Sequence, residues 1–175
     1  MDFECISIVK YPLPVVWETM RDQLPELVSQ QDDIDYIKVQ KRAKKGTKSV
    51  HVISEWKADP PLPSLIKGFI KPDMLVWIDD ADWNNEEHIC HFTITPHYQV
   101  EEIHCVASIK FEQEAKGKST KIIYSGTLTI ARTSRSSIFM TGIIIKGIEA
   151  VASKLIEHNF SKVVRTLDET IKGSK

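Results

Sequence analysis

The stretch SSIFMTGIIIKGIEAVASKLIEHNFSKVVRTLDETI, residues 136–171, decides how this chain folds. Apolar residues recur along it close to every 3.6 positions, which predicts one long α-helix with a buried face. The members of this repeat are Ile144, Ile148, Val151, Leu155, Val163, Leu167 and Ile171. A serine near its start suits a helix cap, and Gly173 suits its end. A helix this long needs a broad apolar surface to pack against, and the rest of the chain must supply it.

The residues before this helix predict the surface, because they follow the period of two that is typical of strands. The clearest strand is Val100–Glu114, in which apolar and polar residues alternate. Six further strands are predicted at Phe3–Tyr11, Ile34–Ala43, Lys48–Lys57, Asp73–Asp82, His88–Thr95 and Lys121–Arg132. Short turns with glycine or asparagine join several of them, which favours antiparallel pairing.

Two short helices are predicted after the first strand, at Val15–Asp22 and at about Leu24–Gln30. Apolar residues recur at helical spacing in the first, and Pro25 suits the first turn of the second. The element order is therefore strand, two helices, six strands and a long helix. We expect an α+β fold in a single domain, residues 1–175, with a curved seven-stranded antiparallel sheet wrapped around the C-terminal helix.

The composition excludes several classes of protein. The chain carries 23 Lys and Arg against 24 Asp and Glu, a net charge of −1, which argues against a general nucleic-acid binder. A hydrophobic fraction of 42% is ordinary for a soluble domain, and no apolar stretch approaches the ~20 residues of a membrane span. Three cysteines do not suggest a disulfide framework, and no secretory signal is visible, so we expect a cytoplasmic protein.

The element order, the long terminal helix and the segment Pro14-Val15-Val16-Trp17-Glu18 resemble the START/SRPBCC superfamily. That group includes the birch-pollen-allergen proteins, lipid-transfer domains and polyketide cyclases, and its fold is called the helix grip. The resemblance covers nearly the whole chain. It implies binding or transport of a hydrophobic small molecule or lipid in a cavity between sheet and helix. We expect neither a cofactor nor a nucleic-acid partner.

The walls of such a cavity are predicted from the apolar residues that would face it. The candidate ligand-binding residues are Trp56, Leu65, Phe69, Trp77, Phe92, Cys105, Tyr124, Met140, Ile144, Ile148 and Val151. Tyr124 would offer its hydroxyl group to the polar end of a ligand. The direction of Trp77 stays open at this point, because Met74, Val76 and Ile78 compete with it for burial.

Two segments, 62–70 and 138–148, concentrate more apolar side chains than a surface element needs. Segment 62–70 is either a short helix packed on the sheet edge or a lid over the mouth of the cavity. Segment 138–148 is either ordinary core or part of the same apolar rim. The basic residues that flank the two segments are Lys67, Lys71, Arg132, Arg135 and Lys146. An apolar rim edged with cations predicts transient contact with an anionic membrane.

Histidines and cysteines cluster in the two strands that flank Pro96. A four-residue loop at Pro96–Gln99 would place Cys90 opposite Cys105 and His91 opposite His104. The cysteines would then point inward and the histidines outward. Since a tetrahedral site needs both kinds on one side, we predict no metal and interpret the cysteines as buried, reduced thiols.

Three functions remain, and a non-enzymatic carrier or sensor of an apolar small molecule leads them. An enzyme similar to the polyketide cyclases and aromatases is the first alternative. It would need an acid–base group inside the cavity, for which Tyr124, Glu55 and His51 are the candidates. A co-chaperone-like protein-interaction module is the second alternative, and it would have a filled interior.

Overall fold

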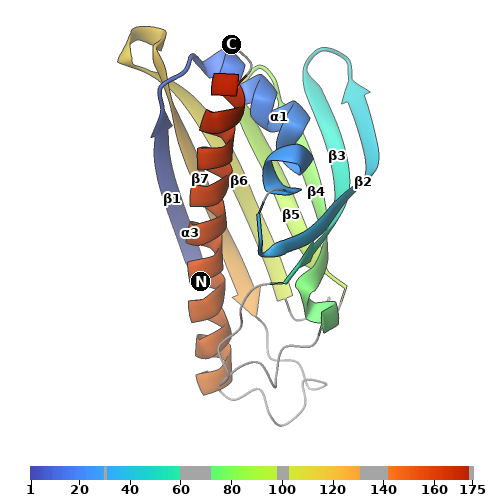
Figure 1. Cartoon of the computed structure of the whole chain (residues 1–175). Coiled ribbons are helices and arrows are strands. Elements are labelled where there is room, and N and C mark those ends of the chain that lie inside the picture. Colours follow the sequence, from blue (N-terminus) through green and yellow to red (C-terminus); the bar gives the residue numbers. More distant parts are fainter. Residues whose placement is uncertain (30, 60–71, 98–102, 131–141, 174–175) are drawn as a thin grey trace.

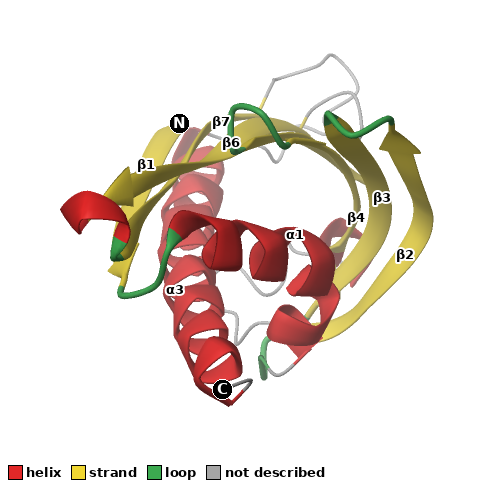
Figure 2. Ribbon diagram, turned by 90° about the horizontal axis from the view of Figure 1, so that it is seen from above, coloured by secondary structure: helices red, strands yellow, loops and turns green. Residues whose placement is uncertain are grey.

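The chain forms one antiparallel sheet whose concave face holds two helices (Figures 1 and 2). A computed structural model describes residues 1–29, 31–59, 72–97, 103–130 and 142–173, with the backbone but not the side chains of 74, 142–144, 148 and 151. The strands are β1 (Asp2–Val9), β2 (Ile34–Lys45), β3 (Ser49–Ala58), β4 (Val76–Asn84), β5 (Ile89–Pro96), β6 (Ile103–Glu114) and β7 (Ser119–Ile130). The helices are α1 (Leu13–Ser29) and α3 (Gly142–Gly173), with short 3-10 turns η1 (Pro72–Leu75) and η2 (Ala115–Gly117).

The strand order is β1-β7-β6-β5-β4-β3-β2, so β2 to β7 form a meander and β1 pairs with the last strand. This confirms the predicted seven-stranded sheet. Its curvature is plain in Figure 2, where the strands arch over α1 and α3. The strand predicted to begin at Asp73 begins at Val76 instead, because Pro72 and the three residues after it form η1.

Alternation along β6 shows how the sheet divides inside from outside. Cys105, Ala107 and Phe111 are buried on the concave face, whereas Val106 between them is 59% exposed on the convex face. Each fully buried large apolar side chain contributes about 1.5–3 kcal/mol. Burial of the inward-facing residues, which recur at every second position, therefore stabilises the packing of this face of the sheet against the helices.

The long helix α3 lies along the concave face, as predicted (Figure 1). Its residues Phe160, Val164, Leu167 and Ile171 are buried, at the i, i+4, i+7 and i+11 positions of a single helical stripe. The predicted beginning, residues 136–141, lies outside the described residues. No helix in the described part of the chain is long and apolar enough to span a membrane.

Helix α1 consists of two helical segments that meet at a kink, and the kink lies between the two predicted helices. Gln23 has non-helical angles, φ −121° and ψ 17°. Pro25 causes the interruption, because it has no N–H to donate to the carbonyl of Arg21 and its ring crowds that turn. Arg42 of β2 donates to this carbonyl instead, with an Nη1–O distance of 3.4 Å.

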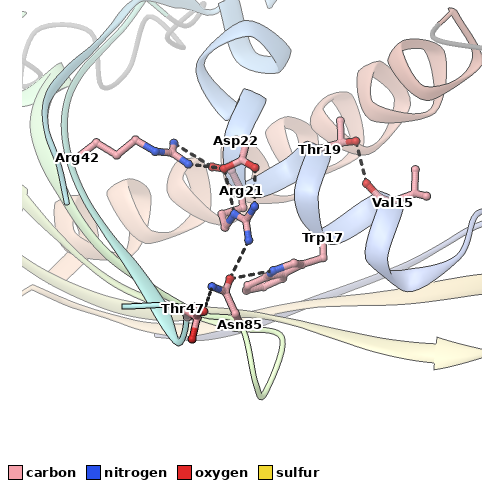
Figure 3. A network of polar contacts seen from close by, with 8 residues as sticks. All are labelled: Val15, Trp17, Thr19, Arg21, Asp22, Arg42, Thr47 and Asn85. Atoms are coloured by element: carbon pink, nitrogen blue, oxygen red, sulfur yellow. Dashed lines mark hydrogen bonds and ion pairs between the residues drawn. The ribbon is translucent and has the colours of Figure 1, made fainter. Parts of the chain in front are cut away.

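A polar network ties α1 to one end of the sheet (Figure 3). Trp17 Nε1 and Arg21 Nη1 both donate to Asn85 Oδ1, at 3.2 and 2.8 Å. Asn85 Nδ2 donates to the carbonyl oxygen of Thr47 at 2.8 Å. The Asp22 carboxylate pairs with both Arg21 and Arg42, and the hydrogen bond from Arg21 lowers its pKa most. The network joins α1 to the β2–β3 and β4–β5 turns.

The pairing of β5 with β6 corrects one prediction. Cys90 lies opposite Ile109 and His91 opposite Ser108, so the predicted Cys90–Cys105 and His91–His104 pairs are wrong. The connection after Pro96 is longer than four residues, and the register moves by four positions. Since a shift by an even number leaves every side chain on its predicted face, Cys90 and Cys105 are still buried, and both are free thiols.

Replacing Asn85 by Ala tests the network. The variant leaves the buried indole N–H of Trp17 without its acceptor, so we expect a loss of about 1–3 kcal/mol in the free energy of unfolding. Urea denaturation measures it. Asn85→Asp, which keeps an acceptor oxygen, is the control and should lose less. A loss below about 0.5 kcal/mol for Asn85→Ala would contradict this role.

Candidate cavity between the sheet and the long helix

A cavity of about 330 Å³ lies between the concave face of the sheet and α3. Its volume falls at the lower end of the range for sites that take drug-sized ligands. Side chains from α1, from β2 to β7 and from α3 line it. On the helix side the lining residues are Ala152, Leu155, Ile156, Asn159, Phe160 and Val163.

Five of the predicted site residues line this cavity: Trp56, Trp77, Phe92, Cys105 and Tyr124. Trp56 stacks on Trp77 with ring centroids 5.9 Å apart, and Phe92 stacks on Tyr124 at 5.8 Å. Trp77 points inward because it shares the face of Ala81 and Trp83, which are both buried. The sheet therefore offers a largely aromatic wall, and the contact of these residues with a ligand stays a prediction.

The structure does not describe the side chains of the other six predicted site residues, so their positions relative to the cavity stay predictions. Leu65, Phe69 and Met140 lie outside the described residues, as do the whole of segment 62–70 and most of the predicted basic rim. Ile144, Ile148 and Val151 belong to α3, but their side chains are not described. Of the rim cations only Lys146 is described, and it is exposed.

Two of the three candidates for acid–base catalysis do not face the cavity. His51 Nε2 lies 2.6 Å from Asp80 Oδ1 on the convex face of the sheet. Glu55 accepts a hydrogen bond from the Tyr36 hydroxyl at 2.9 Å, also outside. Both predictions are wrong because the inward positions of β3 are the even-numbered ones, as buried Val50 and Ser54 show. Tyr124 is the candidate that does face the cavity.

Three polar residues of the cavity, Asp79, Asn159 and Gln31, are not among the predicted site residues. Buried atoms without a hydrogen-bond partner in the described structure are Asp79 Oδ1, Asn159 Oδ1, Trp56 Nε1 and both amide atoms of Gln31. All four residues line the cavity. The alternation of β4 could have identified Asp79, because it lies two residues from Trp77 and from Ala81 on one face.

Burial changes the protonation of Asp79 strongly. Loss of contact with water raises the pKa of its carboxyl group to about 7, and the negative charge of the adjacent Asp80 adds to the effect. Burial likewise raises the pKa of the Cys105 thiol to about 11 and that of the Tyr124 hydroxyl, and the Asp79 charge contributes to both. These three groups therefore share one low-dielectric region of the sheet wall.

A second carboxylate of the cavity differs from Asp79 in having a partner. Asp33, just before β2, pairs with Lys162 of α3 at 2.8 Å, and its side chain is only 6% exposed. This ion pair connects the end of the α1–β2 connection to the long helix. Asp33 therefore has a structural role, because its ion pair joins two elements of the fold. The Asp79 carboxyl group has no cationic partner in the described structure.

The raised pKa of Asp79 predicts a pH-dependent stability. The folded protein keeps a proton on Asp79 up to about pH 7, whereas the unfolded chain loses it near pH 4. The free energy of unfolding therefore falls as the pH rises through this window, and levels off above it. Asp79→Asn removes the effect, so its stability relative to the wild type should grow by about 3 kcal/mol between pH 5 and pH 8.

Urea denaturation at both pH values checks this prediction. Asp82→Asn is the matched control, because Asp82 lies on the same strand but faces solvent, where it pairs with Lys45 at 3.2 Å. Its stability relative to the wild type should stay nearly constant. A pH-independent difference for Asp79→Asn would show that the carboxyl group is not held away from water.

Comparison with known proteins places the fold. No protein-family model and no curated protein matches the sequence. Several solved structures, however, are similar to this chain over nearly its whole length. A protein from Thermus thermophilus has a TM-score of 0.69 at 14% identity, over 100% of this chain and 99% of its own. The ZhuI aromatase/cyclase from a Streptomyces species has a TM-score of 0.69 at 10% identity, over 98% of this chain and 93% of the enzyme.

A third similar structure is norcoclaurine synthase from Thalictrum flavum, in complex with dopamine and hydroxybenzaldehyde. Its TM-score is 0.64 at 10% identity, over 100% of this chain and 88% of the synthase. At such identities the likeness concerns the backbone arrangement. The chain therefore has the same fold as these structures, the helix grip that was expected from its sequence.

Proposed function

We propose that this protein binds a hydrophobic small molecule in the cavity between the sheet and α3. The observation that carries the proposal is the cavity itself, about 330 Å³ with predominantly apolar and aromatic walls. Protein interiors are normally close-packed, and empty space in them is destabilising. A cavity of this size on the concave face is better accounted for by a ligand than by packing.

The energetics of binding are favourable for an apolar ligand. A ligand that removes about 300 Å² of apolar surface from water gains roughly 7 kcal/mol before the costs of ordering it. The volume supports a small molecule rather than a lipid with two long chains. The similar structures include an aromatase/cyclase and a synthase holding two aromatic compounds, which supports a small aromatic ligand.

A binding experiment with two matched variants of α3 tests the proposal. N-phenyl-1-naphthylamine, a neutral apolar dye, should bind the wild type saturably with increased fluorescence. Ala152→Phe places a ring in the cavity and should weaken binding at least tenfold. Ala150→Phe, two residues away and exposed, should bind the dye like the wild type.

Circular dichroism spectra of the three proteins should be alike. Equal binding by the Ala152→Phe variant would show that the dye binds elsewhere. Absence of saturable binding to the wild type, together with no small molecule released from it by organic extraction, would end the proposal.

Catalysis of the cyclase or aromatase type is a second candidate, and one observation favours it. Asp79, with a pKa raised to about 7, lies in the same cavity as the Tyr124 hydroxyl. A carboxyl group with that pKa is suited to remove a proton from carbon next to a carbonyl group. Tyr124 would donate a hydrogen bond to the carbonyl oxygen.

Exchange of α-protons tests this second candidate. The protein should accelerate deuterium incorporation into 2-acetylnaphthalene in D₂O, followed by NMR, because Asp79 would carry the proton in each direction. Asp79→Asn should abolish the acceleration and Asp82→Asn should retain it. An unaccelerated reaction despite binding of the ketone leaves a carrier as the function.

A further inference from the structure

Among the buried polar atoms of the cavity that lack a hydrogen-bond partner, acceptors outnumber donors. Asp79, Asn159 and Gln31 each present an oxygen that accepts no hydrogen bond from the described residues. The unpaired donors are the indole N–H of Trp56 and the amide nitrogen of Gln31. A buried polar atom without a partner costs about 1–3 kcal/mol, so these positions favour a ligand or water that supplies the missing hydrogen bonds.

The charges of the cavity are uneven as well. The described lining includes two carboxyl groups, Asp33 and Asp79, and no lysine, arginine or histidine. Lys162 lies beside the cavity, but its Nζ is held by Asp33 at 2.8 Å. Among the described residues, one carboxyl group therefore remains without a cation. An ionised carboxylate buried alone is costly, and a cation brought by the ligand would remove that cost.

The position of Asp79 suits contact with a ligand. It lies on β4, opposite Ser54 of β3 and Ile94 of β5, and therefore on the interior of the sheet rather than at an edge. Two residues away on the same face is Trp77, which stacks on Trp56. Indole rings attract cations as well as apolar groups. A ligand with an aromatic ring and a cationic end would match both features.

We propose that the ligand of this cavity is a hydrophobic amine, and that Asp79 receives its ammonium group. This inference rests on the proposed function, because it names the chemical class of the molecule bound there. The aromatic wall holds the apolar body of the amine, and the Asp79 carboxylate forms a charge-assisted hydrogen bond with its nitrogen. Asp79 is thus a specificity-determining residue.

The protonation states allow this pairing. Above its pKa of about 7, Asp79 is ionised, and an alkyl ammonium group with a pKa like that of lysine stays protonated at pH 8. A cation beside the carboxyl group further favours its ionised form. A measurement at pH 8 therefore compares ligands while both partners carry charge.

Four naphthalene probes and three proteins test the inference. The probes share one apolar body: 2-(2-naphthyl)ethylamine, 2-(2-naphthyl)ethanol, 2-ethylnaphthalene and 2-naphthylacetate. Their dissociation constants are measured at pH 8 for the wild type, Asp79→Asn and Asp82→Asn. Asp79→Asn keeps the shape of the side chain and removes its charge, whereas Asp82→Asn removes a charge on the convex face.

We expect Asp79→Asn to weaken binding of the amine at least tenfold and that of 2-ethylnaphthalene less than threefold. The alcohol should lose less than the amine, and the acetate should bind the wild type weakly and the variant better. Asp82→Asn should leave all four constants near those of the wild type. Asp79→Ser provides a second variant if Asp79→Asn does not give a native circular dichroism spectrum.

The outcomes separate this inference from the proposed function. If 2-ethylnaphthalene binds but the amine does not, or if Asp79→Asn weakens all probes equally, the amine inference is wrong and the binding function stands. A loss for the alcohol as large as that for the amine also overturns it, because charge would then play no part. If none of the four probes binds although the neutral dye does, the amine inference is wrong and the binding function stands; if the dye does not bind either and extraction releases no small molecule, the proposed function itself fails.

Discussion

Everything in this fold depends on filling the concave face of a curved sheet. One end is filled by Trp17, which is 3% exposed and makes edge-on contacts with Trp83 and Phe111 at 5.3 and 5.2 Å. Asn85 holds its indole nitrogen in place, so α1 cannot slide along the sheet without losing that hydrogen bond. Side chains of α1 and of α3 both face the sheet beyond this end without filling the space in front of it. The cavity is the space that remains.

The two carboxyl groups of the cavity, those of Asp33 and Asp79, differ in whether a cation pairs with them. Asp33 is buried with Lys162 and joins β2 to α3. Asp79 has a buried Oδ1 that accepts no hydrogen bond from the described residues, and no cation among them pairs with its carboxyl group. A protein under selection for stability alone would replace such a group, since uncompensated burial of a charge is among the costlier arrangements in a core. Asp79 lies on the same face of β4 as Trp77, which stacks on Trp56, and we propose that a ligand bound there offsets this cost.

Much of the fold is predictable because hydrophobic period is a local property. The period of two located all seven strands and kept Cys90 and Cys105 on the inner face even though their pairing was misjudged. The predicted register between β5 and β6 was wrong because the register depends on the length of the connection after Pro96. Alternation of apolar and polar residues carries no information about that length. Likewise the side-chain chemistry of His51 and Glu55 suits acid–base catalysis, but both residues lie at odd-numbered positions of β3 and point outward.

By itself the sequence determined the strands, the long helix, the faces of most residues and a set of aromatic candidates for the inner wall, because these follow from spacing along one segment. Only the tertiary structure decided that the interior is hollow, since an apolar residue has the same pattern whether it faces a neighbour or a void. It also decided that Asp79 has no cationic partner among the described residues. The partner of a charged group is set by segments far apart in the chain, as Asp33 and Lys162 demonstrate, and so is the lack of one.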